Sequence, residues 1–80
     1  MSVCNIIAVR IDHRVKNAIN FQNVITEFGC SIRVRLGIHE ADEGVCASDG
    51  LIILQVISKE KELLENLNNT PGITAKLIEI

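Results

Sequence analysis

The sequence has few aromatic residues and no excess of positive charge. It contains two phenylalanines but neither tryptophan nor tyrosine, and its 8 basic residues are outnumbered by 10 acidic ones. Proteins that hold single-stranded nucleic acids stack the bases on aromatic side chains, and binding to duplex DNA requires a basic surface. We therefore expect this chain to bind no nucleic acid by itself.

The sequence also lacks a long hydrophobic run and a pattern of paired cysteines. No stretch approaches the ~20 consecutive apolar residues of a membrane-spanning helix. The first basic residue, Arg10, follows the first apolar run, which is unlike a signal peptide. Cys4, Cys30 and Cys46 are odd in number and irregularly spaced, as is typical of free thiols in a reducing compartment. These absences predict a cytoplasmic protein without membrane contact.

Aliphatic side chains are abundant, because 48% of the residues are apolar and most of these are Ile, Leu and Val. A chain of 80 residues forms a single domain, residues 1–80. A domain this small buries only ~60% of the surface of its unfolded chain. The surplus of apolar residues therefore predicts that another subunit covers part of the surface.

Hydrophobic periodicity predicts four strands and two helices. The strands are expected at residues 3–11, 31–40, 50–57 and 73–80, and the helices at residues 14–28 and 59–68. The first and third strands are apolar on both faces, as central strands are. The order β-α-β-β-α-β with right-handed crossovers predicts an α+β fold, in which one four-stranded antiparallel sheet carries both helices on one face.

The period of each element also predicts which side chains are buried. The second strand is expected to turn its apolar residues inward, namely Ile32, Val34, Leu36 and Ile38, and the others outward, namely Ser31, Arg33, Arg35, Gly37 and His39. The first helix is expected to bury one stripe, formed by Val15, Ala18, Ile19, Phe21, Ile25 and Phe28. Gln22 lies within this arc and requires a hydrogen-bond partner. Ser58 is expected to cap the second helix.

A sheet with both helices on one face leaves its other face uncovered. Cys4, Ile6 and Ala8 are expected there, together with alternate residues of the third strand. Exposing a row of apolar side chains to water is unfavourable. We therefore predict a homo-oligomer, a dimer or tetramer, that associates through this face or through an edge strand.

Two groups of polar residues are candidates for binding an anion. Arg33, Arg35 and His39 are expected in a row on one face of the second strand, where they would hold a carboxylate or phosphate. The alternative is that these charges only discourage pairing of a strand edge. Asp12 and His13 join the first strand to the first helix. There, backbone N–H groups would meet an anion, or Asp12 would simply cap the helix.

His39 and Cys46 are the candidate metal ligands. An imidazole and a thiolate around one acidic loop would suit Zn, Ni or Cu, and oligomer symmetry would double their number. The alternative is a solvated loop with an incidental cysteine. The sequence has no C-x-x-C and no H-x-x-x-H pair, and it identifies no particular cofactor. It also has no nucleophile elbow and no phosphate-binding loop, so we expect no enzyme.

Several segments together carry a resemblance to a known family. They are residues 22–30 (QNVITEFGC), residues 35–40 (RLGIHE), Cys46, residues 50–51 (GL) and residues 71–73 (PGI). In these segments the chain resembles the iron-only hydrogenase system regulators, which are small ACT-like proteins. The resemblance implies a ferredoxin-like (ACT-like) fold, an oligomer, a regulatory role and no catalysis.

The resemblance also implies where a ligand would bind. ACT domains bind amino acids at the junction of the first strand and first helix, where this chain has Asp12 but no glycine. Nickel-responsive repressors of related fold place His and Cys ligands at a subunit interface, as His39 and Cys46 would be. We therefore expect a non-catalytic regulatory module, linked to iron-only hydrogenases, that binds a small ligand or a protein partner. Its expected contacts are Asp12, His13, Arg33, Arg35 and His39. The alternative is a metal or thiol redox sensor using His39 and Cys46.

Overall fold

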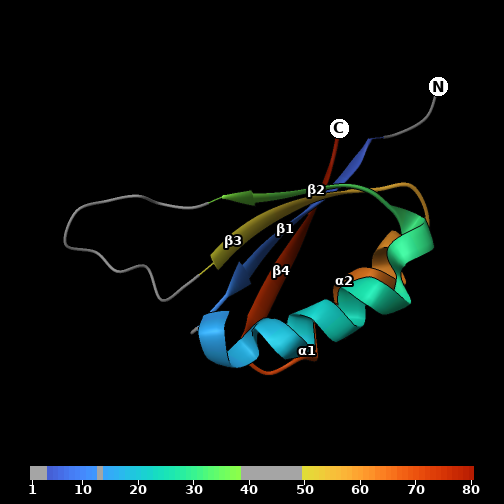
Figure 1. Cartoon of the computed structure of the whole chain (residues 1–80). Helices are drawn as coiled ribbons and strands as arrows, with labels where there is room; N and C mark the ends of the chain where they lie inside the picture. The colour runs from blue at the N-terminus through green and yellow to red at the C-terminus, as the bar shows by residue number, and fades with distance from the viewer. Residues whose placement is uncertain (1–3, 13, 39–49) are drawn as a thin grey trace.

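The computed structural model describes residues 4–12, 14–38 and 50–80 and, for residues 14–16 and 38, the backbone alone. Its elements follow the predicted order (Figure 1). They are β1 (Asn5–Ile11), α1 (Arg14–Glu27), the 3-10 turn η1 (Gly29–Ser31), β2 (Ile32–Ile38), β3 (Gly50–Val56), α2 (Glu60–Asn68) and β4 (Ile73–Glu79). Neither helix of this described part is long and apolar enough to cross a membrane.

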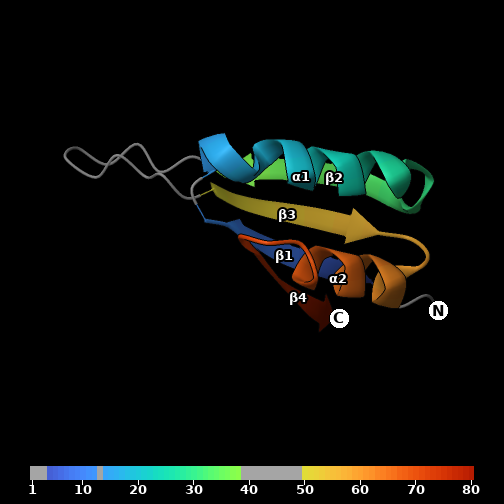
Figure 2. The ribbon, with the colours of Figure 1, turned by 90° about the horizontal axis from the view of Figure 1, so that it is seen from below.

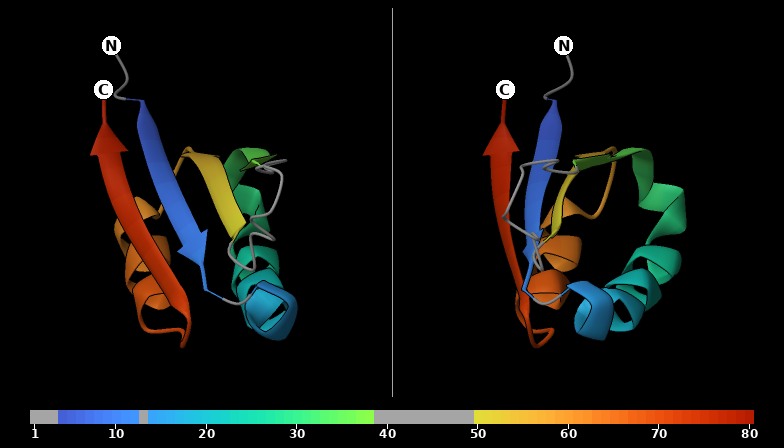
Figure 3. Two further views of the ribbon diagram at one scale, coloured as in Figure 1. Left: turned by 90° about the vertical axis from the view of Figure 1, so that its left-hand side faces the viewer. Right: turned by 60° about the vertical axis from the view of Figure 1, so that its left-hand side comes forward.

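The four strands form one antiparallel sheet in the order β2-β3-β1-β4. β1 and β3 are therefore the central strands, as their apolar faces predicted. Both helices lie on the same face of the sheet (Figure 3). α2 packs on β4 and β1, whereas α1 packs on β1 and α2. Seen from below, α1 follows the β2 side of the sheet and α2 the β4 side (Figure 2). The predicted β-α-β-β-α-β architecture is confirmed.

The core lies between this face of the sheet and the helices. Alternate strand residues point into it, because successive side chains leave a strand on opposite faces. The buried apolar residues are Ile7, Val9, Ile11, Ile52, Leu54, Val56, Ile73 and Ala75 from the strands, and Phe21, Ile25, Phe28, Leu63 and Leu67 from the helical segments. Each fully buried large side chain contributes on the order of 1.5–3 kcal/mol, so this aliphatic cluster stabilises the fold.

β2 departs from the predicted pattern because it contains one extra residue near its start. Ile32 pairs with Val56 of β3, whereas Val34 pairs with Gln55, the adjacent residue of β3. Arg33 is therefore the inserted residue of a β-bulge. Successive side chains of a strand point to opposite faces of the sheet, so one inserted residue moves every following side chain of β2 to the face opposite the predicted one.

The bulge reverses the predicted faces of β2 from Val34 to Gly37, whereas Ile32, before the bulge, packs against the core as predicted. Arg35 pairs with the fully buried Leu54, so Arg35 and, two residues on, Gly37 lie on the face that the helices cover. Val34 and Leu36 lie on the other face, where they are 48% and 56% exposed. The prediction that Val34 and Leu36 point inward, and that Arg35 and Gly37 point outward, is therefore wrong.

α1 buries a narrower stripe than predicted. Phe21 and Ile25 are buried, but Ala18 is exposed and Ile19 is 72% exposed. Both of these residues line a pocket between α1 and the sheet. Ala18 and Ile19 of the predicted stripe thus border a hollow instead of the core, and the side chain of Val15 lies outside the described part of the chain.

α2 begins without the predicted serine cap. Lys59 stands before the helix with a left-handed backbone (φ 55°), and no side chain caps the helix there. The hydroxyl of Ser58 instead donates a hydrogen bond to the hydroxyl of Ser31 at 2.9 Å. Since Ser31 is buried, Ser58 supplies a partner that this hydroxyl requires.

The face of the sheet opposite the helices carries apolar residues on all four strands, beside the polar residues Arg10, Gln55, Thr74 and Lys76. Its exposed apolar residues are Val34, Leu36, Leu51 and Ile78, and its half-buried ones are Ile6, Ala8 and Ile53. These seven residues are called the open face below. The register joins them, because Ile53 pairs with Leu36 on one side and with Ala8 on the other. The expected uncovered row of Ile6 and Ala8 is therefore present, with Cys4 half-buried at its end.

Candidate functional site

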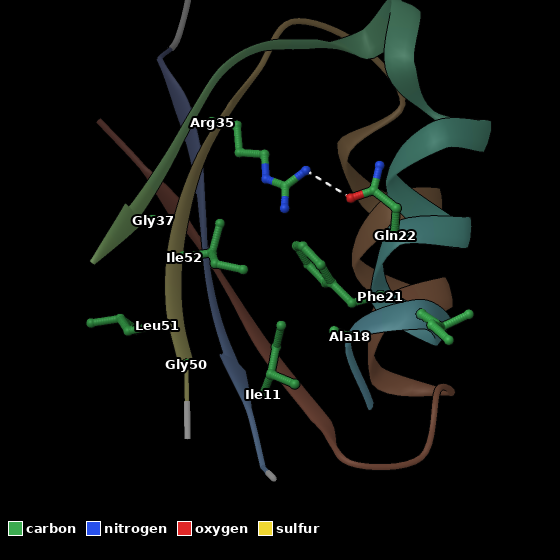
Figure 4. Close-up of a pocket in the computed structure, with 10 residues that line it drawn as sticks. Ile11, Ala18, Phe21, Gln22, Arg35, Gly37, Gly50, Leu51 and Ile52 are labelled. Carbon is green, nitrogen blue, oxygen red and sulfur yellow. Dashed lines mark hydrogen bonds between the residues drawn. The ribbon is translucent and has the colours of Figure 1, made fainter. Parts of the chain in front are cut away.

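A pocket of about 500 Å³ lies between α1 and the β2–β3 half of the sheet (Figure 4). Its inner wall is formed by buried core residues, namely Ile11, Phe21 and Ile52. Its outer boundary includes Ala18, Ile19 and Leu51. Gln22 and Arg35 are its polar side chains, and Gly37 and Gly50 complete the lining. The pocket is thus mostly apolar, with a single amide and a single guanidinium.

The pocket exists because small residues occupy the facing positions of β2 and α1. Gly37 pairs with Ile52 on the face that α1 overlies, and a Cβ added to Gly37 would meet nothing within 4 Å. Ala18 faces the same space from α1. If the register of the Ile32–Val56 pair continued along β2, Leu36 would stand opposite Ile52 and its side chain would fill this volume. The register that follows the bulge therefore keeps the pocket open.

Arg35 spans the pocket from β2 to α1. Its Nη1 donates a hydrogen bond to Oε1 of Gln22 at 2.9 Å, and its guanidinium carbon lies 5.3 Å from the centroid of the Phe21 ring. This distance is within the range of a cation–π contact. The partner that Gln22 requires is thus Arg35. Among the described residues no carboxylate lies within ion-pair distance of Arg35, so its charge faces a neutral amide and a ring.

The predicted row of Arg33, Arg35 and His39 is divided by the bulge. Arg35 lines the pocket, whereas Arg33 is the exposed bulge residue and is not part of the lining. His39 lies outside the described residues. Of the three candidates, Arg35 is therefore the one that the structure places at a cavity.

The junction of β1 and α1 is held by contacts within the chain. The backbone N–H of Asp12 donates to the carbonyl of Gly72 at 2.7 Å, and the side-chain amide of Asn17 donates to the carbonyl of Asp12. The Asp12 carboxylate pairs with Arg10, with 3.2 Å between Oδ1 and Nε. His13 lies outside the described residues. The described contacts of Asp12 thus hold the chain together at this junction. The predicted anion site at Asp12 and His13 stays a prediction, because His13 is not described.

The candidate metal ligands His39 and Cys46 both lie outside the described residues. Within the described part of the chain, no group of three or more His, Cys, Asp or Glu side chains could hold a metal ion. Cys4 is half-buried, and its sulfur accepts a hydrogen bond from the Gln55 amide at 3.7 Å. Cys30 is exposed at a separate hollow of about 200 Å³.

Sequence reasoning found Arg35 but missed its companions in the pocket. The sequence predicts Phe21 and Gln22 within a buried stripe of the first helix, and Gly37 on the outer face of the second strand. A signal was available, because a glycine inside a strand often marks a bulge or a place where another group approaches closely. Gly37, two residues after Arg35 in β2, is that signal.

Comparison with known proteins identifies the fold. The structure of the uncharacterized protein TM1266 from Thermotoga maritima matches this one with a TM-score of 0.79, at 17% sequence identity and over 99% of each chain. No protein-family profile matches the chain, and no curated protein matches it. The chain therefore has a ferredoxin-like α+β fold that extends over nearly its full length.

Proposed function

We propose that the protein is a non-catalytic, ACT-like regulatory module that binds a small molecule in the pocket between α1 and β2 and associates with further copies of itself. The observation that carries this proposal is the mostly apolar pocket of about 500 Å³ with Arg35 in its wall. Small-molecule sites are typically concave and mostly apolar, have volumes of roughly 300–1,000 Å³, and contain a few polar groups that fix the ligand.

The lining residues support binding without catalysis. The polar side chains among the described lining residues are Gln22 and Arg35. General acids and bases in enzymes are mostly His, Asp, Glu, Lys, Tyr or Cys. An amide and a guanidinium are instead groups that orient a ligand by hydrogen bonds. The pocket is therefore suited to recognition.

The regulatory part of the proposal rests on the position of Leu51. This residue borders the pocket and, at 42% exposure, also belongs to the open face; its side chain leaves β3 on the side away from α1 (Figure 4). A ligand that favours one arrangement of this strand end would favour one mode of association over another. The resemblance of residues 22–30 and 35–40 to hydrogenase system regulators supports such a role, with a hydrogenase system as the regulated process.

The test uses indole, a small neutral aromatic compound, in a titration of ¹⁵N-labelled protein. We expect indole to shift the amide signals of Phe21 and Ile52 in the unaltered protein. The variant Gly37→Leu should lose these shifts, because space for a side chain exists at Gly37 and the leucine would fill the pocket. Sedimentation with and without indole should show a changed self-association constant in the unaltered protein and no change in Gly37→Leu.

Gly29→Ala is the matched control. A Cβ at Gly29 also meets nothing within 4 Å, but Gly29 lies in η1, away from the pocket lining. This variant should bind indole like the unaltered protein. Indole shifts that are absent from Phe21 and Ile52, or that persist in Gly37→Leu, would refute the proposed binding site.

A further inference from the structure

We propose that the natural ligand of this pocket is a small organic monoanion, with an apolar body and one carboxylate, and that it lacks an amino group. The proposal rests on the function proposed above and specifies the ligand. It follows from the charge, the polarity and the size of the pocket.

The charge of the pocket favours an anion. Arg35 is the one charged side chain among the described lining residues, and its described contacts are the neutral amide of Gln22 and the ring of Phe21. A guanidinium has five N–H donors in a planar fork that matches a carboxylate. A ligand carboxylate would therefore form charge-assisted hydrogen bonds that Gln22 cannot provide.

The absence of an acidic group from the described lining argues against an amino acid as the ligand. An α-ammonium next to the bound carboxylate would lie close to the Arg35 guanidinium, and the one acceptor among the described lining side chains, Oε1 of Gln22, already accepts a hydrogen bond from Arg35. Placing like charges close together without a compensating acid is unfavourable. The same carboxylic acid without the amine avoids this penalty, so the pocket should prefer it.

The shape of the pocket favours a ring or a short chain in the ligand body. A volume of about 500 Å³ is within the range of sites for small organic molecules. The Phe21 ring, already in contact with Arg35, offers an aromatic surface against which a second ring can pack offset or edge-on. An arylalkanoate therefore combines both features, and 3-phenylpropanoate is a suitable probe.

The experiment compares three probes of nearly equal size by NMR titration. They are 3-phenylpropanoate, 3-phenylpropanamide, which lacks the charge, and L-phenylalanine, which adds the ammonium. We expect the dissociation constant of 3-phenylpropanoate to be at least ~10-fold lower than the other two, since hydrogen bonds to charged groups are worth more than neutral ones. The preference for the anion over the amide should weaken as salt is added.

Two variants connect this preference to Arg35. Arg35→Gln should remove the preference of the pocket for the acid over the amide. Arg35→Lys keeps the charge without the planar fork and should retain part of the preference. Arg33→Gln is the matched control, because Arg33 lies on the same strand but outside the pocket lining, and it should keep the full preference.

The possible outcomes distinguish a failure of the proposed ligand class from a failure of the proposed binding function. If indole binds at the pocket but 3-phenylpropanoate binds no better than its amide or than phenylalanine, the ligand class is wrong and the binding site stands. A preference that survives in Arg35→Gln also overturns the ligand class. If neither indole nor the acid binds at Phe21 and Ile52, both proposals fail.

Discussion

Arg35 holds its charge at the boundary between the core and solvent. Its guanidinium lies over the Phe21 ring and is bonded to Gln22, while the residue as a whole remains exposed. A long side chain can place its stem along apolar surface and keep its charged end near water. Arg35 therefore joins β2 to α1 without occupying the pocket in the way a leucine would.

Gly72 is a residue at which the addition of a single methyl group should clearly destabilise the protein. Its backbone is left-handed (φ +81°), and an added Cβ would overlap the side chain of Asn17, which is hydrogen-bonded to Asp12. We expect Gly72→Ala to lower the free energy of unfolding by about 1–3 kcal/mol, because it adds backbone strain and displaces Asn17. Urea denaturation would measure this loss.

Gly29→Ala again serves as the comparison, since a Cβ has room there. Its free energy of unfolding should stay within about 0.5 kcal/mol of the unaltered protein. Equal losses of unfolding free energy in Gly72→Ala and Gly29→Ala would show that an alanine side chain at position 72 does not clash with Asn17.

Lys59 is a position where a substitution should stabilise the protein. It is the one described non-glycine residue with positive φ, and it precedes α2 without a side-chain cap. Glycine adopts this backbone without the penalty that a Cβ brings. We expect Lys59→Gly to raise the free energy of unfolding by about 0.5–1 kcal/mol in the same denaturation assay.

The contrasting variant is Glu65→Gly, within α2. Glycine in a helix interior destabilises by about 1 kcal/mol. Lys59→Gly and Glu65→Gly should therefore change the free energy of unfolding in opposite directions. A loss of stability in Lys59→Gly would contradict the left-handed backbone at Lys59.

At the scale of the element, β2 determines the character of the site. The bulge at Arg33 places Arg35 and Gly37 beneath α1 and turns Val34 and Leu36 to the open face. The register that follows the bulge therefore has two consequences. It leaves Gly37 opposite Ile52, which keeps the pocket open, and it adds two large apolar side chains to the surface expected to meet another subunit.

Deletion of Arg33 tests this account of β2. Val34 would then follow Ile32 directly and keep Gln55 as its partner, so the bulge would disappear while Arg35 stays opposite Leu54. We expect the pocket to persist and the free energy of unfolding to change by less than about 1 kcal/mol. Nuclear Overhauser contacts between Arg35 and Leu54 would report the register, with Arg33→Ala as the control that keeps the chain length. Contacts between Leu36 and Ile52 in either variant would contradict the register.

The order of the elements could be predicted from the sequence, because each strand and helix has a strong hydrophobic period. The central position of β1 and β3 followed from their apolar faces. The faces of β2 could not be predicted in this way. Residues 32–38 alternate regularly in the sequence, and the bulge at Arg33 is set by pairing with β3, which the sequence of β2 alone does not report. The pocket was missed for the same reason.

The whole molecule has more apolar surface than its own two helices cover. The helices shield one face of the sheet, and the open face carries Val34, Leu36, Leu51 and Ile78 exposed to solvent. An apolar patch that is continuous across strands commonly marks an interface. Because a symmetric dimer brings the same patch of two subunits together, the open face is suited to meet itself.

Leu36→Glu tests association through the open face. Leu36 is 56% exposed there and lies opposite Ile53, so a glutamate would bring like charges close together across the dimer axis and remove apolar contact. We expect the unaltered protein to sediment as a dimer or tetramer of the 8.8 kDa chain and Leu36→Glu to sediment as a monomer. Ile19→Glu makes the same chemical change at a 72% exposed residue of α1 and should leave the oligomer intact. An unaltered protein that is monomeric at micromolar concentration would refute the interface, and dissociation by both variants would place it elsewhere.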